Sequence, residues 1–292
     1  MLVTVVLASG RGTRLRPLST DERPKQFLDV ISGKSLVEDT IARVKNICKN
    51  ENVFVVINEK QETLARSLLN FLPHENLIVE PNMKETLASM SHSVSYISKL
   101  KGNDVTYLFL PSDHYIKEND LFEDSIKEGL EIFKKYNNFV LYGLKPTDPN
   151  PNYGYIQTKL LNNDNLITNF IEKPKLEIAN EIYNKDNYFW NNAIMLANKT
   201  LIYNAIKETL PEQYNLLLKL DNNEITKNAF FEQTFVDNFS RSILEKQSGM
   251  MLVHAKYTWY DIGSFEVLFH VLALLGKTDD IEKIKHLINT SK

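Results

Sequence analysis

The sequence predicts an α/β fold in which a mixed, mostly parallel sheet is flanked by helices. Short apolar runs rich in valine and isoleucine alternate, in the first half of the chain, with longer segments of helical periodicity. Such alternation favours parallel strands with helices on both faces of the sheet. The chain of 292 residues is also long enough for one large core or two modest domains.

The elements of the first half follow in a regular order. Strands are predicted at residues 2–8, 53–57, 77–79, 105–110 and 139–144, and helices at 36–47, 61–71, 84–100 and 121–136. Ser35-Leu36-Val37-Glu38 has the spacing of a capping box, which marks the start of the first helix. Ligands of such sheets bind beyond the carboxyl ends of the strands, so the loops after Ala8, Val79 and Leu110 should converge on one cleft.

The second half begins at a proline-rich turn, residues 146–151. A strand pair is predicted at 153–158 and 166–171, a strand at 250–254, and helices around 177–183, 201–210, 211–220, 265–275 and 280–288. We therefore expect two halves, residues 1–145 and 146–265, and a helical tail, residues 266–292. The tail can pack on the core or on a second subunit through Leu268, Phe269, Val271, Leu272 and Leu275.

Composition excludes several classes of protein. With 43% hydrophobic residues, 24% charged residues and a net charge of −3, the chain is typical of a soluble globular protein and not of a nucleic-acid binder. One cysteine, Cys48, allows no internal disulfide and no cysteine zinc cluster, and it should be a small core residue. Neither a signal peptide nor a stretch of about eighteen apolar residues is present, so we expect a cytoplasmic protein without membrane contact.

The loop after the first strand carries the strongest functional signal. It contains Gly10 and Gly12, hydroxyls at Ser9 and Thr13, and arginines at positions 11, 14 and 16. Glycines let backbone N–H groups approach an anion, and arginines bind phosphate through two hydrogen bonds, so the loop predicts a phosphate site. Two known phosphate motifs fail. The dinucleotide fingerprint lacks its third glycine, replaced by Leu15, and Gly33-Lys34-Ser35 lacks the first glycine of a P-loop.

A third motif matches. Gly10 to Ser19, followed by Pro24-Lys25-Gln26-Phe27-Leu28, resembles the signature of the sugar-1-phosphate nucleotidylyltransferase family, in particular the bacterial enzymes that make GDP-mannose. The resemblance runs from about residue 3 to 269 and implies a Rossmann-like fold of the nucleotide-diphospho-sugar transferase type with a sugar-binding lobe. It also implies the transfer of GMP from GTP to mannose 1-phosphate. Nucleotide contacts are implied for Ala8, Ser9, Gly10, Gly12, Thr13 and Ser112, and charge neutralisation of the triphosphate for Arg14 and Lys25.

Two carboxylates lie in matching motifs far apart in the chain. Asp113 directly follows a predicted strand in Pro111-Ser112-Asp113-His114, and Asp261 lies in Trp259-Tyr260-Asp261-Ile262-Gly263-Ser264. Taken alone, Asp113 also suits a turn or a helix cap. The resemblance implies that Asp113 and Asp261 hold Mg²⁺, which prefers oxygen ligands, and His114 is expected to be structural.

Further motifs concern the base and the sugar. Glu80-Pro81 resembles the segment that lies against the base, and Glu80 or Glu85 could accept both hydrogen bonds from guanine, although Lys84-Glu85-Thr86-Leu87 departs from the family pattern. The resemblance implies sugar contacts for Gly154, Glu172, Lys173 and Asn191, with Lys173 also on the sugar phosphate. Asn192-Ala193 replaces Ser-Gly, so the sugar stays open among mannose and similar hexoses or heptoses.

The expected partners are GTP and a sugar 1-phosphate, with a homodimer as one alternative for the apolar tail. Another sugar 1-phosphate or another nucleotide is the first alternative function. A catalytically silent subunit that senses nucleotide sugars is the second, because Ser9 and Glu85 depart from the family pattern. From the length of the tail we expect no C-terminal isomerase domain of the kind found in bifunctional relatives.

Overall fold

A computed structural model describes residues 1–290 of the chain. They form two compact units, each built from separate segments. The first unit contains residues 1–5, 84–110 and 120–256, and the second contains 6–83, 111–119 and the residues from 257 onward. The two predicted halves, divided at residue 145, were defined by the ligand that each is expected to bind, and not by compactness. They therefore stay a prediction.

The first unit contains a mixed sheet with the strand order β4-β9-β6-β10-β8-β7. Its strands are β4 (Thr106–Pro111), β6 (Val140–Leu144), β7 (Gly154–Leu161), β8 (Asp164–Ile171), β9 (Tyr188–Asn198) and β10 (Met251–His254). The predicted pair β7 and β8 is confirmed as an antiparallel hairpin. The long strand β9 pairs antiparallel with β4, β6 and β7, whereas β10 pairs parallel with β6.

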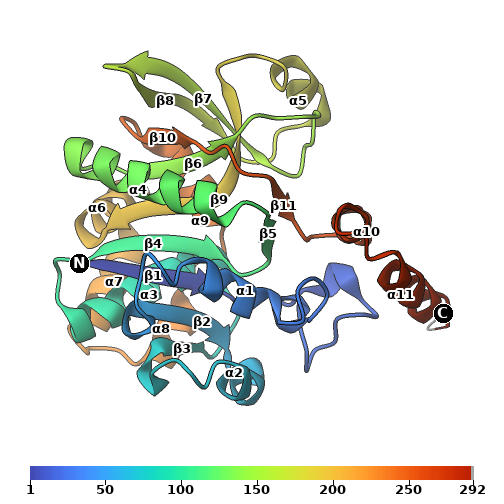
Figure 1. The fold of residues 1–292 in the computed structure, drawn as a ribbon. Helices are drawn as coiled ribbons and strands as arrows, with labels where there is room; N and C mark the ends of the chain where they lie inside the picture. The colour runs from blue at the N-terminus through green and yellow to red at the C-terminus, as the bar shows by residue number, and fades with distance from the viewer. Residues whose placement is uncertain (291–292) are drawn as a thin grey trace. The chain divides into compact units, whose positions relative to one another are not determined.

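Helices cover this sheet. They are α3 (Glu85–Lys101), α4 (Asn119–Tyr136), α5 (Leu176–Ile182), α6 (Lys199–Thr209), α7 (Pro211–Asp221), α8 (Lys227–Gln233) and α9 (Phe239–Ser242). Figure 1 shows α4 in front of the sheet, where Gly129 lets the helix lie against Tyr142 and Leu196. Helices α3 and α8 pack on each other through His92 and the rings of Phe230 and Phe231.

The second unit holds the end of the first strand and the signature loop. Its elements are α1 (Leu36–Arg43), β2 (Val53–Asn58), α2 (Glu62–Leu68), β3 (Leu77–Glu80), β5 (His114–Ile116), β11 (Trp259–Asp261), α10 (Phe265–Leu274) and α11 (Thr278–Thr290). Strand β1 (Leu2–Leu7) ends in this unit. The N–H of Ala8 donates to the Val56 carbonyl at 2.8 Å, and the N–H of Ser112 donates to the Leu7 carbonyl at 3.2 Å.

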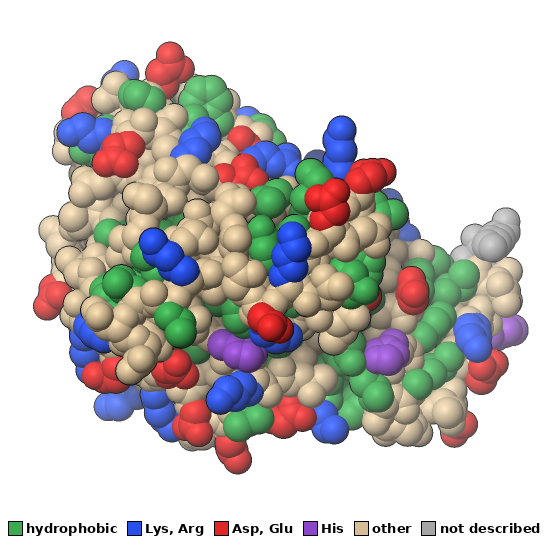
Figure 2. Space-filling view, turned by 90° about the horizontal axis from the view of Figure 1, so that it is seen from above, with side chains coloured by type: hydrophobic (Ala, Val, Ile, Leu, Met, Phe, Trp, Pro, Cys, Tyr) green, Lys and Arg blue, Asp and Glu red, His purple; other side chains and the backbone are tan. Residues whose placement is uncertain are grey.

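The C-terminal helices pack on the signature region. Leu268, Val271 and Leu272 of α10 are buried in one apolar cluster with Leu15 and Leu36. The tail was expected to pack either on the core or on a second subunit, and these three residues pack on the core. Other tail residues stay exposed, and Figure 2 shows hydrophobic side chains over the C-terminal helices at its right. The exposed residues of these helices include Leu274, Leu275 and Leu287.

The structure differs from the sequence prediction at the end of one helix and in several elements that were not predicted. Helix α1 ends at Arg43 instead of residue 47, so the buried Cys48 follows the helix. Strands β5, β9 and β11 and helices α8 and α9 were not predicted. Within residues 1–290 the structure contains no helix long and apolar enough to cross a membrane. Acidic and basic side chains are interspersed over the face shown in Figure 2, in keeping with the small net charge of −3.

Candidate active site

The signature loop is held against a short 3-10 helix, Lys25–Phe27. Gly12 has a φ of 63°, and a Cβ there would lie 2.5 Å from the Lys25 nitrogen and Cβ, so only glycine fits. Gln26 Nε2 donates to the carbonyls of Ala8 at 2.5 Å and Gly10 at 2.9 Å, and Ser19 Oγ donates to the Gly12 carbonyl at 2.7 Å. Because these carbonyl oxygens are engaged, the loop suits an anion better than an ordinary turn does.

Strand pairing brings the two distant carboxylates together. Strands β5 and β11 are antiparallel, with Asp261 opposite His114 in the register. The Ile262 N–H donates to the Asp113 carbonyl at 3.3 Å, which fixes the residues before β5 as well. Helix α1 supports the same backbone, because Thr40 Oγ1 donates to the Ser112 carbonyl at 3.4 Å and Arg43 donates to the His114 carbonyl at 3.4 Å.

Lys25 lies between these carboxylates. Its Nζ is 2.5 Å from Asp113 Oδ2 and 3.6 Å from Asp261 Oδ1, and the lysine residue is only 5% exposed. Burial lowers the pKa of Lys25, but the two carboxylates more than offset that effect, and its pKa lies above the usual value. Burial raises the pKa of Asp113, but Lys25 and His114 reverse the shift, so its pKa lies below the usual value. The Lys25–Asp113 pair is therefore ionised at neutral pH.

Arg14 joins this group through Gly263. A Cβ on Gly263 would lie 3.0 Å from the Arg14 Nη2 atom, so the missing side chain makes room for the guanidinium. The charge of Arg14 is close enough to lower the pKa of Lys25. Two cations from the signature region and two carboxylates thus meet in the second unit, as the sequence motifs predict.

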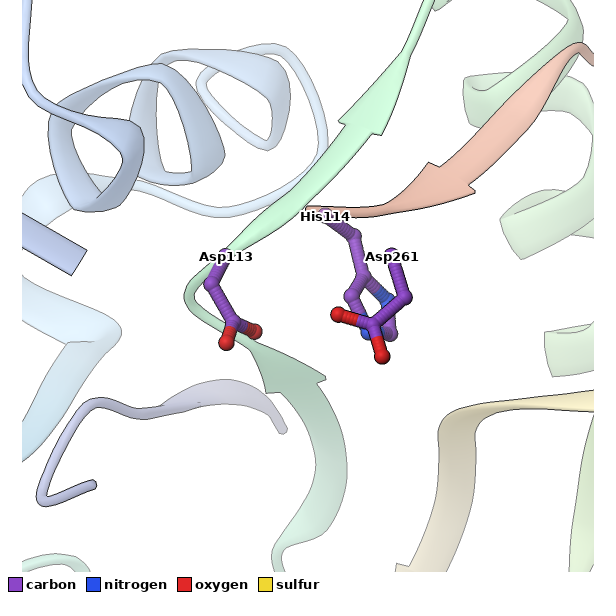
Figure 3. Close-up of side chains that lie close together, drawn as sticks. All are labelled: Asp113, His114 and Asp261. Carbon is purple, nitrogen blue, oxygen red and sulfur yellow. The ribbon is translucent and has the colours of Figure 1, made fainter. Parts of the chain in front are cut away.

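His114 accepts a hydrogen bond from its neighbour in the strand pair. Trp259 Nε1 donates to His114 Nδ1 at 3.0 Å. Burial lowers the pKa of His114, which favours a neutral ring, and a neutral ring that accepts at Nδ1 carries its proton at Nε2. The Nε2 atom is then a donor and not a metal ligand. Figure 3 shows the His114 ring beside Asp261, with both carboxylates facing the same space.

The donor set fits a divalent cation. Ligand atoms of Asp113, His114 and Asp261 lie within 4.8 Å of one another, and the two carboxylate side chains are 26% and 25% exposed. Lys25 and Arg14 balance the formal charges of the two aspartates, so the carboxylate oxygens themselves, and not a net negative charge, would attract a cation. Because His114 uses Nδ1 to accept from Trp259, the oxygens of Asp113 and Asp261 are the atoms that suit a metal here.

Two predicted nucleotide contacts are buried in the second unit. Glu80 is 0% exposed, and its carbonyl accepts a hydrogen bond from Asn58 Nδ2 at 3.1 Å. Ser112 is 3% exposed, and both of its backbone groups are engaged, by Leu7 and by Thr40. Pro81, which follows Glu80, is partly exposed. A carboxylate that reads a base must be accessible, so this burial disfavours Glu80 for that role.

The predicted sugar residues come together in the first unit. A Cβ on Gly154 would lie 2.8 Å from Glu172 Oε2 and 3.3 Å from the Asn191 Cβ, so these three residues face one small space. The Glu172 side chain is 6% exposed, and Lys173 Nζ lies 3.7 Å from its Oε1. Burial raises the pKa of Glu172 in spite of the Lys173 charge.

Unusual backbone conformations mark the same motifs. Within residues 1–290, seven residues other than glycine have positive φ, and four of them are asparagines, which tolerate this region. The remaining three are Glu85, Lys173 and Ala193, with φ of 63°, 51° and 58°. All three lie in predicted site motifs, which is where strained backbone tends to occur.

The start of α3 is fixed by a distant loop of the first unit. Phe239 N–H donates to Thr86 Oγ1 at 2.9 Å, and Leu87 N–H donates to the Asp237 carbonyl at 3.1 Å. Lys84 caps the helix without a side-chain hydrogen bond, so these contacts hold the first turn. Glu85 itself is exposed at this turn, and its carboxylate is accessible to a ligand.

Comparison with known proteins identifies a family for this chain. The family model described as nucleotidyl transferase matches residues 3–278. The chain belongs to the nucleotidyl transferase family. A mannose-1-phosphate guanylyltransferase of Escherichia coli is 29% identical over 95% of this chain and 62% of its own length. One of Sinorhizobium fredii is 29% identical over 92% of this chain and 54% of its own length.

A solved structure of the same type supports the fold of this nucleotidyl transferase. The crystal structure of a protein from Thermus thermophilus, described as a mannose-1-phosphate geranyltransferase, superposes with a TM-score of 0.85 at 27% identity. The match covers 93% of this chain and 79% of that one. This likeness confirms the predicted fold class. The chain spans only 54% to 62% of the length of the two curated relatives.

Some residues of the candidate site were missed by sequence reasoning. The Trp259–His114 hydrogen bond depends on a strand pair, and no motif of the sequence predicts it. Glu245 lies beside Glu172, because its Oε1 accepts a hydrogen bond from the Glu172 N–H, and the charge of Arg241 opposes the rise in the pKa of Glu172 that burial causes. The sequence around them, Phe239-Ser240-Arg241-Ser242-Ile243-Leu244-Glu245, carried no signal that we recognised.

Proposed function

We propose that this chain transfers GMP from GTP to mannose 1-phosphate and so forms GDP-mannose and pyrophosphate. One observation carries the proposal: Arg14 and Lys25, from the family signature, lie beside the carboxylates of Asp113 and Asp261. Cations next to a site that suits a divalent metal are what phosphoryl transfer requires, because the chemistry consists mainly of positioning and charge neutralisation. The names of the relatives supply the nucleotide and the sugar.

The reaction is a displacement at phosphorus. An oxygen of the sugar phosphate attacks the α-phosphorus of GTP, the bond from that phosphorus to the bridging oxygen breaks, and pyrophosphate leaves. Asp113 and Asp261 would hold Mg²⁺, which when bound supplies positive charge to the phosphate oxygens. Arg14 and Lys25 bind the β- and γ-phosphates and stabilise the charge that the leaving group gains.

The sugar-side residues orient the nucleophile. Lys173 binds the sugar phosphate. Glu172 accepts hydrogen bonds from sugar hydroxyls next to Gly154, and Asn191 makes hydrogen bonds with them as donor or acceptor. Glu172 is enclosed, with 6% of its side chain exposed, so hydrogen bonds to it are protected from water. Holding the two reactants in line accelerates the step without covalent participation of the protein.

Glu85 is the residue that we propose for the base. Guanine presents N1–H and N2–H₂ as two parallel donors, which one carboxylate can accept together. Glu85 is exposed at the start of α3 and its backbone is fixed there, whereas Glu80 is buried. The loop residues Ala8, Ser9, Gly10, Gly12 and Thr13 would contact the triphosphate.

The experiment that tests this function measures pyrophosphate release with Mg²⁺, mannose 1-phosphate and each nucleoside triphosphate in turn. We expect release with GTP and at least tenfold less with ATP, CTP or UTP. Release with another triphosphate would keep the reaction type and overturn the role of Glu85. No release with any triphosphate or any hexose or heptose 1-phosphate would overturn the proposed function.

A further inference from the structure

The side chain of His114 carries one hydrogen-bond donor that the fold itself does not use. His114 is 9% exposed, and its Nδ1 accepts a hydrogen bond from Trp259 Nε1 at 3.0 Å. An indole N–H can only donate, so Nδ1 has no proton and the ring proton is on Nε2. Within residues 1–290 the structure gives this Nε2 no hydrogen-bond partner. Because buried polar groups nearly always have a partner, the donor calls for a ligand.

The ring is held in this orientation by its neighbours. Trp259 packs edge-on against it, with ring centroids 5.2 Å apart and ring planes at 86°. Trp259 is itself 7% exposed, and the residue before it is fixed twice. The Thr258 N–H donates to Glu118 Oε2 at 2.7 Å, and the Thr258 carbonyl accepts from the Lys117 N–H at 3.1 Å. The pairing of β5 with β11 thus fixes both the ring and the group that selects its tautomer.

The unused donor lies at the two carboxylates. A ring nitrogen of His114 and one oxygen each of Asp113 and Asp261 all lie within 4.8 Å of one another. Figure 3 shows the end of the ring beside the Asp261 carboxylate, at the space that both carboxylates face. The ammonium of Lys25 is already paired with Asp113 at 2.5 Å and lies 3.6 Å from Asp261 Oδ1. The carboxylates therefore have a donor of their own, and Nε2 is available to a further acceptor.

An ionised phosphate oxygen is the acceptor that suits this position. Lys25 and Arg14 balance the formal charges of the two aspartates, so a neutral N–H can bind phosphate without placing a third cation beside a metal site. A hydrogen bond to an ionised acceptor is stronger than one between neutral groups. If negative charge on that oxygen grows during the reaction, a preorganised donor stabilises the transition state more than the bound substrate.

We propose that His114 Nε2–H donates to an oxygen of the pyrophosphate that leaves, and that Trp259 is the positioning residue that keeps the ring in the donating tautomer. The proposal rests on the proposed function, because it adds a donor to the same transfer site. It places His114 in one group with Lys25, which binds the same phosphates in the proposed reaction.

The first test observes the ring nitrogens by NMR in the full chain labelled with ¹⁵N-histidine. The His114 signals, identified by their loss in His114→Gln, should show a protonated Nε2 and an unprotonated Nδ1. Addition of Mg²⁺ and pyrophosphate should shift the Nε2 signal, whereas the signals of the exposed His74 should not move. A proton on Nδ1, or His114 signals that do not respond in a chain that binds pyrophosphate, would overturn the proposal.

The second test separates the donor from the ring. His114→Phe keeps a ring against Trp259 and should lower kcat for pyrophosphate release by about two orders of magnitude, because one preorganised donor is lost. His114→Gln supplies an amide N–H at nearly the same reach and should recover most of that loss. His74→Phe, the same change at an exposed position, is the matched control and should leave kcat unchanged. Thermal unfolding identifies any variant that fails to fold.

The positioning role of Trp259 has a readout of its own. Trp259→Phe removes the indole N–H, so Nδ1 can take the proton and a second tautomer should appear in the NMR spectrum. The kcat should then fall by about tenfold, as for loss of a group that orients a site residue. Calorimetric titration with Mg²⁺ should give an unchanged affinity, since the carboxylates stay in place. A single Nε2–H tautomer in Trp259→Phe would refute the positioning role.

The outcomes separate this inference from the proposed function. A folded His114→Phe that turns over as fast as His74→Phe shows that the His114 donor has no role in the reaction. If His114 responds to pyrophosphate but no triphosphate yields pyrophosphate, the proposed function fails and the phosphate donor stands. If the unmodified chain neither reacts nor binds pyrophosphate, both are wrong.

Discussion

Lys25 is the residue on which the candidate site converges. Its ammonium group is buried and pairs with Asp113 at 2.5 Å and more weakly with Asp261 at 3.6 Å. A buried ammonium without partners would lose its proton, and here the carboxylates keep the pKa of Lys25 raised. Lys25 therefore keeps a positive charge, which can stabilise the negative charge of the leaving pyrophosphate.

Replacing Lys25 tests this role. Lys25→Met should lower kcat for pyrophosphate release by about two to three orders of magnitude, because one preorganised cation is lost in the transition state. The same change should tighten Mg²⁺ binding, since the group then loses one of its two positive charges. Lys34→Met removes an exposed lysine from the same region and should leave both values unchanged. Turnover unchanged in Lys25→Met would contradict the assignment.

Glu85 determines the base preference in our account. Glu85→Gln keeps the size of the side chain but replaces one acceptor by a donor, which opposes a donor of guanine. We expect the ratio of kcat/KM for GTP over ATP to fall by about tenfold to a hundredfold, as for loss of a charged hydrogen bond. Steady-state kinetics with both nucleotides measure it. An unchanged ratio would contradict the role of Glu85 and would make the backbone of the signature loop the next candidate for base recognition.

Ala193 has a strained backbone conformation in a motif that we propose for sugar binding. Its φ of 58° is costly for alanine but not for glycine, and the family pattern has glycine here. Ala193→Gly should raise the free energy of unfolding by about 0.5–1 kcal/mol, as estimated for relief of a left-handed alanine. Ala197→Gly, in the same strand at ordinary φ, is the control and should lower it. Chemical denaturation measures both, and equal destabilisation by the two changes would refute the strain argument.

At the scale of elements, two pieces of secondary structure position the carboxylates. Strands β5 and β11 place Asp261 opposite His114, and α1 holds the backbone of residues 112–114 through Thr40 and Arg43. Helix α1 begins in a complete capping box, in which the Ser35 N–H donates to Glu38 Oε2 at 2.9 Å. The stability of that helix start therefore supports the backbone that carries the proposed metal ligand Asp113.

The capping box gives a prediction about stability. Ser35→Ala removes the side-chain acceptor at the start of α1 and should cost about 1 kcal/mol of the free energy of unfolding. Ser67→Ala, at an exposed position inside α2, should be neutral or slightly stabilising, because alanine favours helix interiors. Denaturant unfolding of both variants tests this. Equal stability of the two would mean that the cap contributes nothing.

Sequence patterns predicted most elements but not all. Leu2 to Leu7 and the cap at Ser35 were readable because apolar runs and capping residues are local signals. Strand β9 was missed because Asn191 and Asn192 interrupt its apolar pattern, and both asparagines accept hydrogen bonds from backbone two residues on. These bonds accompany the irregular register between β6 and β9 near Ala193. A three-residue strand such as β5 is too short for any periodicity to show.

Site residues divide in the same way. Arg14, Lys25, Asp113 and Asp261 were predicted from motifs, and the structure brings them together because β5 pairs with β11. Glu80 and Glu85 could not be separated by sequence, since burial depends on the folded chain. Glu245 could not be found at all, because its contact is with a backbone N–H that any residue at position 172 would offer.

At the scale of the whole molecule, each of the two compact units contains one set of the residues that we propose. The residues that we propose for the phosphates and the metal belong to the second unit, and those that we propose for the sugar belong to the first. Each unit is built from segments far apart in the chain. The residues of one proposed group therefore come from several motifs that are distant in the sequence. The net charge of −3 says little about where the proposed ligands bind. The positions of individual charged side chains determine that.

The central claim is that Asp113 and Asp261 form the metal side of a nucleotidyl transfer site. The measurement that tests it most directly is the rate of pyrophosphate release from GTP and mannose 1-phosphate, compared between the unmodified chain and Asp261→Asn. We predict a loss of about two to three orders of magnitude in kcat, with folding retained. Asp124→Asn, an exposed surface change, should keep the full rate. Full activity in Asp261→Asn would contradict the account.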